Sequence, residues 1–436
     1  EVDTDEKTIT LAAPHQYSLN AGHGAGVFYA MNALEELDRP GEYVVDWERD
    51  RIYVLPPEDA EEGGCAISAT EAPLLRLQGT SHVEIRGLDL RRARGGGAVI
   101  SIRGGSHNRI INCTVANSGG SAISVRGGSD NGVAGCELYN LGAGGVSLGG
   151  GNRETLEPCG NYAEDNHIHH FARLKRTYQP AVRFSGVGCR MSHNEVHHAP
   201  HTAVLFGGNE HVMEFNHIHH VCMDTDDAGA IYSGRDWTER GTVIRHNFIH
   251  DLGGGTNIGN QGVYLDDMFC GTRVYGNVFY DMGRAIMIGG GRDNVVKNNI
   301  AVDCRVSIHI DARGLGWASY HAKDPDGTLV RRLKDVPYKE EPWSSRYPEL
   351  VDILDNRPAA PVGNVVTRNV FARCDTKELA DEARDLGTIE GNLTTDEDPG
   401  FAAPEQLDFR LREDSAVFER LPEFERIPFD KVGPRD

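Results

Sequence analysis

The chain has 436 residues, with 44 Lys and Arg against 65 Asp and Glu, which gives a formal net charge of −21. This length exceeds one compact core of ordinary size, so several domains or one elongated repeat are expected. The acidic balance disfavours nucleic acid and anionic membrane surfaces as partners. Nine cysteines without a C-x-x-C spacing favour neither a disulfide framework nor a zinc ribbon.

Residues 1–75 do not follow the repeat that dominates the rest of the chain, and we expect them to form a β-rich cap or inserted segment. Within them the stretch GEYVVDWERDRIYVLPPEDA predicts a hairpin that closes at Glu48-Arg49-Asp50. The charged opening residues do not resemble a signal peptide.

Nine segments between residues 98 and 313 share one pattern of alternating apolar residues and align without gaps. They are AVISIRGG, SAISVRGG, GVSLGGG, AVRFSGV, AVLFGGN, AIYSGRD, GVYLDDM, AIMIGGG and SIHIDAR. Every inward position except Ser233 is apolar, which indicates strands with one buried face. Most copies recur roughly 22 residues apart, the length of one three-strand coil. We therefore predict an all-β, right-handed parallel β-helix with coils over residues 76–311.

A second repeat places one asparagine in each coil, between two short β-like runs. Its members are Asn112, Asn166, Asn194, Asn216, Asn247, Asn277, Asn299 and Asn369. Asparagine tolerates the left-handed conformation and can bond to the amide of a stacked neighbour. We predict a structural asparagine ladder at one corner, with no catalytic role.

The coils that end at Ala230 and Gly262 carry 5 and 10 residues beyond the usual 22, and their extra sequences, CMDTDDAG and LGGGTNIGNQ, fall in the same turn. Long loops stacked over one strand predict a walled groove. Side chains alternate along a strand, so the outward positions of that strand can be read from the sequence. From Arg183 to His309 these positions form a surface of Tyr and Met, the floor of the groove. A column of small residues beside it becomes acidic at Asp266 and Asp311.

Carboxylates cluster on these two coils. Asp227 enters one strand, and Asp266-Asp267 closes the same strand one coil later. Adjacent coils rise by about 4.8 Å, so such a pair can flank one glycosidic bond, with carboxyl groups ~5 to 9.5 Å apart. The alternatives are ordinary turn chemistry or a calcium site. We predict Asp227 and one of Asp266 and Asp267 as catalytic, with no cofactor unless calcium is bound.

Other polar and aromatic side chains of the groove are expected to hold the sugar. They are Arg183, His201, Tyr232, Arg235, Trp237, Tyr264, His309 and Asp311.

Histidines recur as NHIHH at 166–170, NEVHH at 194–198 and NHIHH at 216–220, with His250 in register. Stacked imidazoles can bind a transition metal, but a hydrogen-bonded outward ladder is the expected arrangement, and no metal site is predicted. His198 and His220, like His201, enter the turn toward the acidic groove and are expected to reach a substrate hydroxyl.

Residues 312–361 interrupt the coil spacing with Trp, Tyr and Pro and are expected to form an insertion over the groove. The stretch GNVVTRNVFARC then resumes one coil, so residues 362–436 are expected to hold the last coil and an irregular tail. Cys304 and Cys374 share one repeat position, and we expect a buried thiol stack there rather than a bridge.

Three segments, DTDDAGAIYSGRDWTERGTVIRHNFIHDLG, GVYLDDMFCGTRVYGNVFYDMGRAIMIGGGRDNVVKNN and SIHIDARGLGW, resemble the β-helical glycoside hydrolases of family 141, which include fucosidases and xylanases. The resemblance extends to LDRPGEYVVDWERDRIYVLPP and IPFDKVG. It implies a β-helix with a small inserted β domain and two active-site aspartates that match Asp227 and one of the LDD pair. Chains of that family begin earlier, so a fragment or a divergent start is expected.

These observations favour a glycoside hydrolase that acts on a neutral or branched glycan, a plant or microbial polysaccharide or oligosaccharide, outside the cell or in the periplasm. The partner is a carbohydrate rather than nucleic acid or a membrane. A calcium-dependent polysaccharide lyase or epimerase is the first alternative, although the groove columns contain no lysine to abstract a proton. The second alternative is a non-catalytic glycan-binding β-helix.

Overall fold

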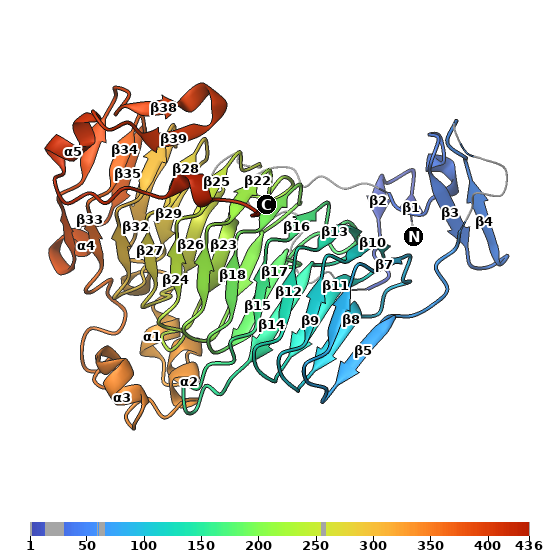
Figure 1. The fold of residues 1–436 in the computed structure, drawn as a ribbon, viewed down its shortest axis with the longest axis horizontal. Coiled ribbons are helices and arrows are strands. Elements are labelled where there is room, and N and C mark those ends of the chain that lie inside the picture. Colours follow the sequence, from blue (N-terminus) through green and yellow to red (C-terminus); the bar gives the residue numbers. More distant parts are fainter. Residues whose placement is uncertain (1, 14–29, 59, 61–65, 254–258, 436) are drawn as a thin grey trace. The chain divides into compact units, whose positions relative to one another are not determined.

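The computed structural model describes residues 2–13, 30–58, 60, 66–253 and 259–435 (Figure 1). The chain divides into two units, Glu1–Ile67 and Ser68–Asp436. The second unit thus begins before residue 75, where the sequence placed the boundary. The reason is that the amides of Ala72 and Leu74 already bond to carbonyl groups of the next coil, at Gly95 and Val99.

The first unit contains two antiparallel pairs of strands. Strand β1 (Val2–Asp3) pairs with β2 (Thr8–Ile9), and β3 (Tyr43–Asp46) pairs with β4 (Arg51–Val54). A short 3-10 helix, η1 (Leu34–Glu36), precedes β3. The β3–β4 hairpin closes over residues 47–50, at the turn predicted from the sequence.

The second unit consists mainly of three parallel sheets of 11 strands each, and every coil contributes one strand to each sheet in turn. The first sheet contains β5 (Leu75–Gln78), β8 (Ala98–Arg103), β11 (Ser121–Arg126), β14 (Val146–Gly150), β17 (Val182–Gly186), β20 (Val204–Phe206), β23 (Gly229–Gly234), β26 (Gln261–Asp266), β29 (Arg284–Ile288), β32 (Val306–Ile310) and β35 (Thr376–Leu379). The second sheet contains β6 (Glu84–Arg86), β9 (Arg109–Ile111), β12 (Gly132–Ala134), β15 (Tyr162–Glu164), β18 (Arg190–Ser192), β21 (Val212–Glu214), β24 (Val243–Arg245), β27 (Arg273–Tyr275), β30 (Val295–Lys297), β33 (Val365–Thr367) and β36 (Thr388–Glu390). The third sheet contains β7 (Asp89–Arg91), β10 (Thr114–Ser118), β13 (Glu137–Leu141), β16 (His167–His169), β19 (Glu195–His197), β22 (His217–His219), β25 (Phe248–His250), β28 (Val278–Tyr280), β31 (Ile300–Val302), β34 (Val370–Ala372) and β37 (Leu393–Thr395). This arrangement confirms the predicted right-handed parallel β-helix.

The predicted register of the first sheet is confirmed from β8 to β32, and it shifts only beyond the predicted strands, between β32 and β35. Ile123 pairs with Ile100 and Val146, and further along the stack Val263 pairs with Ile231 and Ile286. Because period-two strands alternate their side chains, these apolar residues share the interior. They pack with apolar residues of the other two sheets into one continuous core.

The asparagine ladder runs along the corner between the second and third sheets. Each side-chain amide from Asn166 to Asn369 donates to the Oδ1 atom of the next member, at 2.8–3.0 Å. The ladder extends to Asn392, which the sequence analysis missed. Asn112 was assigned wrongly, because the ladder position in that coil belongs to Cys113, the residue before β10, and Cys136 follows it in the next coil.

A second ladder, not predicted, occupies the corner between the first and second sheets. Its asparagines include Asn108, Asn131 and Asn161 at one end and Asn294 and Asn364 at the other. Between these groups the ladder residue changes identity. His211 there accepts the amide of Cys189 through Nδ1. The mixed residue types hid this ladder from a search for one repeated letter.

The insertion between β32 and β33 is helical. It comprises η2 (Arg313–Leu315), α1 (Tyr320–Lys323), α2 (Thr328–Lys334), α3 (Trp343–Arg346) and η3 (Pro348–Leu350). Its apolar residues form a separate core around Trp343, Leu329 and Leu333, into which the coil residues Trp237 and Met268 also pack. No helix in the described part of the chain is long and apolar enough to cross a membrane.

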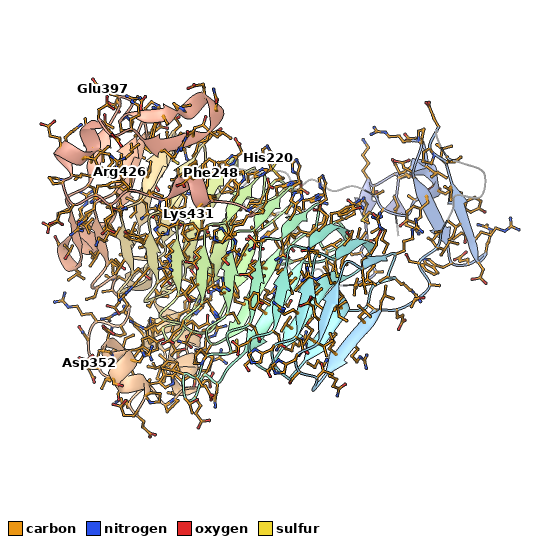
Figure 2. All side chains as sticks on the ribbon, in the orientation of Figure 1. His220, Phe248, Asp352, Glu397, Arg426 and Lys431 are labelled. Atoms are coloured by element: carbon orange, nitrogen blue, oxygen red, sulfur yellow. The ribbon has the colours of Figure 1, made fainter. Side chains whose placement is uncertain are left out.

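The C-terminal segment adds structure after the coil at β33–β35. Its elements are α4 (Asp381–Leu386), the hairpin of β38 (Phe401–Ala403) and β39 (Asp408–Leu411), η4 (Pro404–Gln406), α5 (Ala416–Arg420) and η5 (Phe429–Lys431). Phe401 and Phe409 pack against the outer residues Phe248 and Val278 of the third sheet. The tail therefore lies along the outside of the coils, and Figure 2 labels Phe248 and Lys431 in this region.

We expect Asn247→Ala to lower the free energy of unfolding by about 1–3 kcal/mol, because it leaves buried backbone amides and carbonyls without partners. The Asn247 amide nitrogen donates to Asn277 and to the Met213 carbonyl, and its Oδ1 accepts from Asn216. Chemical denaturation measures the change. Asn356→Ala, at an exposed position, is the control and should change stability by less than about 0.5 kcal/mol. An Asn247 variant as stable as the control would contradict the structural role.

Candidate active site

Two tyrosines on neighbouring strands of the first sheet organise the carboxylates. Tyr232 on β23 pairs in register with Tyr264 on β26, and their rings meet edge to face at 5.3 Å. The Tyr232 hydroxyl donates to Asp266 Oδ2 at 2.9 Å, and the Tyr264 hydroxyl donates to Asp227 Oδ1 at 3.0 Å. The parity of the strands thus aims both phenols outward, and each one holds a predicted catalytic aspartate.

Asp227 stands at the turn into β23, in the left-handed conformation with φ 52°. Aspartate tolerates this conformation better than most residues because its short side chain bonds locally. The residue is exposed, yet partial burial of its carboxyl raises the pKa of Asp227, against the lowering effect of the hydrogen bond from Tyr264. The carboxyl is therefore both reachable from solvent and inclined to keep a proton.

Asp266 closes β26 and faces the same space. Burial and the adjacent Asp267 carboxylate raise the pKa of Asp266, and hydrogen bonds from the two tyrosine hydroxyls oppose that rise. Tyr232 and Tyr264 stand in register on neighbouring strands, so the two aspartates that they bond lie on adjacent coils.

Arg313, in η2, is the central cation of the site, and the sequence analysis did not single it out. Its Nη1 atom lies 2.5 Å from Asp266 Oδ1 and 3.0 Å from Asp267 Oδ1, and its Nη2 atom lies 2.8 Å from Asp311 Oδ2. The side chain is only 8% exposed. One buried guanidinium thus compensates three carboxylates. The signal was present in the SIHIDARGLGW motif, two residues after Asp311.

Asp267 is placed differently from Asp266. It is 2% exposed, and its two oxygens are bound to Arg313 and, at 2.5 Å, to Arg235 Nε. Both oxygens are therefore occupied by cations, and little of the carboxyl is open to a substrate. This geometry favours Asp266 as the partner of Asp227 and gives Asp267 the task of positioning the two arginines.

His309 and Asp311 form the far end of the network, on and after β32. His309 Nδ1 lies 2.5 Å from Glu378 Oε2, and its Nε2 lies 3.3 Å from Asp311 Oδ2. Although burial acts to raise it, hydrogen bonds from His309 and Arg313 lower the pKa of Asp311 to about 2. Asp311 is thus ionised and serves mainly to orient Arg313.

Arg183 and His201 lie on the other side of Tyr232. Arg183 shares its outward column, two strands away through Leu205, and donates to the Tyr178 carbonyl at 2.6 Å. The His201 ring packs on Tyr178 at 4.8 Å, and burial lowers the pKa of His201 to about 4. His201 Nδ1 has no hydrogen-bond partner among the described residues.

Three expectations for the sugar-binding residues need correction. Trp237 is completely buried in the core of the insertion, so its ring cannot stack on a sugar. Tyr264 and Met287, which we expected to be exposed on the floor of the groove, are only 3% and 4% exposed. The acidic network and the insertion cover them. The exposed aromatic ring at this site is instead Trp317, which is 66% exposed and lies 5.6 Å from the Arg313 guanidinium.

His198 and His220 also lie elsewhere than predicted. They stack on each other at 5.1 Å and bond to His197 and His219, respectively. These contacts place them at the edge of the third sheet, where Figure 2 labels His220. Of the loop LGGGTNIGNQ, residues 254–258 lie outside the described residues.

Glu239 is another carboxyl that the sequence analysis missed. Burial, followed by the charge of Asp236, raises the pKa of Glu239 to about 7. Its Oε1 atom would lie 2.9 Å from a side chain added at Gly207, the residue after β20. The small-residue column therefore makes room for a partly protonated carboxyl near the Tyr232 end of the site.

The same face of the first sheet continues into a cationic groove at its N-terminal end. A cavity of about 600 Å³ is lined by Arg76, Arg103, Arg126 and Lys175, together with small residues such as Ser101. No carboxylate lines it, and among the described residues none of the four cations has an ion-pair partner. Arg103 and Arg126 are paired directly in register.

Residues 74–179 and 180–320 both match the family model described as "Right handed beta helix region". The chain belongs to this right-handed β-helix family. No curated protein matches it. Similar solved structures include one titled "Glycoside hydrolase", at 14% identity and a TM-score of 0.46, with 63% of this chain and 57% of that chain covered. This β-helix chain thus spans little more than half the length of that structure.

Two further structures resemble the β-helix over more of its length. One is titled "The complex structure of XylC with xylose", at 12% identity and a TM-score of 0.42, with 94% of this chain and 74% of that chain covered. The other is the PL6 family polysaccharide lyase Pedsa3628 from Pseudopedobacter saltans, at 12% identity and a TM-score of 0.38, with 84% and 96% covered.

Replacing Arg313 by Ala should destabilise the β-helix by roughly 3–5 kcal/mol, because it leaves three buried carboxylates without the cation that neutralises them. Thermal and urea denaturation measure the loss. Arg332→Ala is the control, since Arg332 is a half-exposed arginine of the same insertion, 3.8 Å from Asp236, and should cost less than about 1 kcal/mol. Equal effects of the two substitutions would show that Arg313 is an ordinary surface cation.

Proposed function

We propose that this β-helix protein is a glycoside hydrolase that cleaves a plant or microbial polysaccharide between Asp227 and Asp266. The observation that carries the proposal is the pair of tyrosines, in register on neighbouring strands, whose hydroxyls donate to these two carboxyls. Carboxyls on adjacent coils, which rise by about 4.8 Å, can reach the ~5–5.5 Å separation of retaining enzymes. The resemblance to family 141 of the glycoside hydrolases supports the same pair of positions.

The two aspartates differ in the way that acid and nucleophile must differ. Asp227 has a raised pKa, and among the described residues no cationic side chain hydrogen-bonds to it, so it suits the general acid that protonates the leaving oxygen. Asp266 is bonded to the Arg313 guanidinium and to the Tyr232 hydroxyl, which favour its carboxylate form and oppose the rise in its pKa that burial causes. Asp266 therefore suits the nucleophile or base. The exposed Trp317 ring supplies an apolar face for a sugar.

The cationic groove indicates that the substrate carries anionic groups. Like charges directly opposite on neighbouring strands are destabilising, so the register pair Arg103 and Arg126 has a cost that an anionic ligand would relieve. In a chain of net charge −21, a groove lined by cations and by no carboxylate departs from the general surface. Uronate carboxylates or sulfate esters on the polysaccharide would complement the charge of this groove. A polymer of this kind also favours an extracellular or periplasmic location.

A polysaccharide lyase is the second candidate, and the cationic groove is the observation that favours it, because lyases act on uronates. The geometry at the acids favours hydrolysis. Arg313 already neutralises Asp266, Asp267 and Asp311, where a calcium-dependent lyase would hold its ion. A lyase product is distinguished by the absorbance of its unsaturated uronate.

Asp227→Asn and Asp266→Asn should each lower kcat by at least about 10²-fold with folding intact, since each removes a proton donor or a nucleophile. Reducing-sugar release from acidic and neutral polysaccharides measures the effect. Because the acid must be protonated, wild-type activity should fall as pH rises through the raised pKa of Asp227. Asp226→Asn is the control, because its Oδ1 still accepts the Asp227 amide as the carboxylate does, and it should stay active. Full activity in either catalytic variant would refute the proposal.

The double variant Arg103→Gln with Arg126→Gln should weaken binding to polygalacturonate at least tenfold, and binding should weaken further as salt rises. Calorimetry in an Asp266→Asn background separates binding from cleavage. Neutral xylan and a sulfated polysaccharide distinguish the anionic groups. The control combines Arg86→Gln and Arg273→Gln, two exposed arginines of the second sheet. Unchanged affinity in the groove variant would contradict the proposal that the substrate is anionic, but it would not contradict the hydrolase proposal.

A further inference from the structure

The outer face of the third sheet carries a histidine and glutamate array that the proposed reaction does not use. In register along one column stand Glu137, His167, Glu195 and His217. In the parallel column stand His169, His197, His219 and His250, whose rings stack at 4.9–5.1 Å. The acidic site lies on the first sheet, so this array is a separate feature.

One arrangement occurs twice within the array, two coils apart. Strand β16 presents the pair His167 and His169, and the carboxylate of Glu137 on β13 lies 3.1 Å from His167 Nδ1 and 2.8 Å from His169 Nε2. Strand β22 presents His217 and His219 in the same way. There Glu195 Oε1 on β19 lies 3.7 Å from His217 Nδ1 and 3.4 Å from His219 Nε2. The same nitrogen atoms face one carboxylate in both copies.

We propose that this face binds a borderline transition-metal cation such as Zn²⁺ at two equivalent sites, one formed by Glu137, His167 and His169 and the other by Glu195, His217 and His219. Within each set the donor atoms all lie within 4.8 Å of one another. Zinc bonds of about 2.0–2.1 Å place neighbouring tetrahedral ligands roughly 3.3 Å apart. The carboxylate to imidazole distances of 2.8 to 3.7 Å bracket that value.

The donor set selects the class of metal. Two imidazoles and one carboxylate suit zinc and its neighbours in the transition series, whereas calcium and magnesium prefer oxygen ligands. Three protein ligands leave a coordination position open for water or another ligand. The carboxylates are reachable, since the side chains of Glu137 and Glu195 are 40% and 33% exposed.

A third imidazole links the two sites. His197 Nε2 lies 2.7 Å from His167 Nε2, and His167, Glu195 and His197 also place their donor atoms within 4.8 Å of one another. His197 can therefore complete the first site or bridge toward the second. The second site lies beside the C-terminal segment, whose Gly433 approaches the His217 side chain.

Equilibrium dialysis of the full chain against Zn²⁺ alone, with the bound metal measured by mass spectrometry, tests the proposal. We expect one Zn²⁺ bound at each site at micromolar concentration. His167→Asn with His169→Asn should lose the first site, and His217→Asn with His219→Asn should lose the second. Co²⁺ in place of Zn²⁺ should give the visible absorbance of a tetrahedral site, which falls by half in each double variant.

The matched control is His82→Asn with His107→Asn. These two rings also stack, at 4.8 Å, but no set of three donor atoms within reach of one ion includes them among the described residues. The control should keep full Zn²⁺ binding. If a histidine double variant fails to fold, Glu137→Gln and Glu195→Gln, which keep the size of each side chain, test the same sites. Wild-type protein that binds no Zn²⁺, or stoichiometry unchanged in the site variants, would overturn the proposal and leave a hydrogen-bonded histidine ladder.

Discussion

The structure depends on one constraint, the parallel register in which every coil repeats the hydrogen bonding of the coil before it. A parallel strand exposes a full row of backbone donors and acceptors, and only a neighbour in matching register satisfies all of them. Slippage by one residue would exchange the inner and outer faces. The two corner ladders oppose such slippage, because each asparagine side chain bonds both the side chain and the backbone amide of its neighbour.

Because register is conserved from coil to coil, outward residues form straight columns. These columns bring side chains from different coils together. Tyr232 and Tyr264 stand one coil apart and therefore bring their aspartates together. The same geometry stacks imidazoles on the third sheet and opposes Arg103 to Arg126 on the first. A solenoid can thus carry an acidic site, a cationic groove and a histidine array on one repeated scaffold without disturbing its core.

Electrostatics separates these three surfaces. At the acidic site, Arg313 reaches three carboxylates from the insertion, and the insertion is held by its own core around Trp343. The geometry of the acidic site and the stability of that helical segment are therefore coupled. In the cationic groove no carboxylate is close, so its positive charge remains available to a ligand.

The sequence by itself determined the fold, the register of the first sheet and the position of Asp227 beside Asp266 and Asp267. It could do so because a period of two and a coil of nearly constant length are local properties that repeat many times. It misplaced Asn112 by one residue and missed the corner ladder that mixes Asn with Cys and His, since those residues share a position but not an identity. Only the tertiary structure decided that Arg313 is central, that Trp237 is buried and Trp317 exposed, and that Asp266 bonds to Tyr232 whereas Asp267 bonds to Arg235. Each of these outcomes depends on how residues 312–361 fold back over the coils, and contacts between segments distant in sequence leave no period to detect.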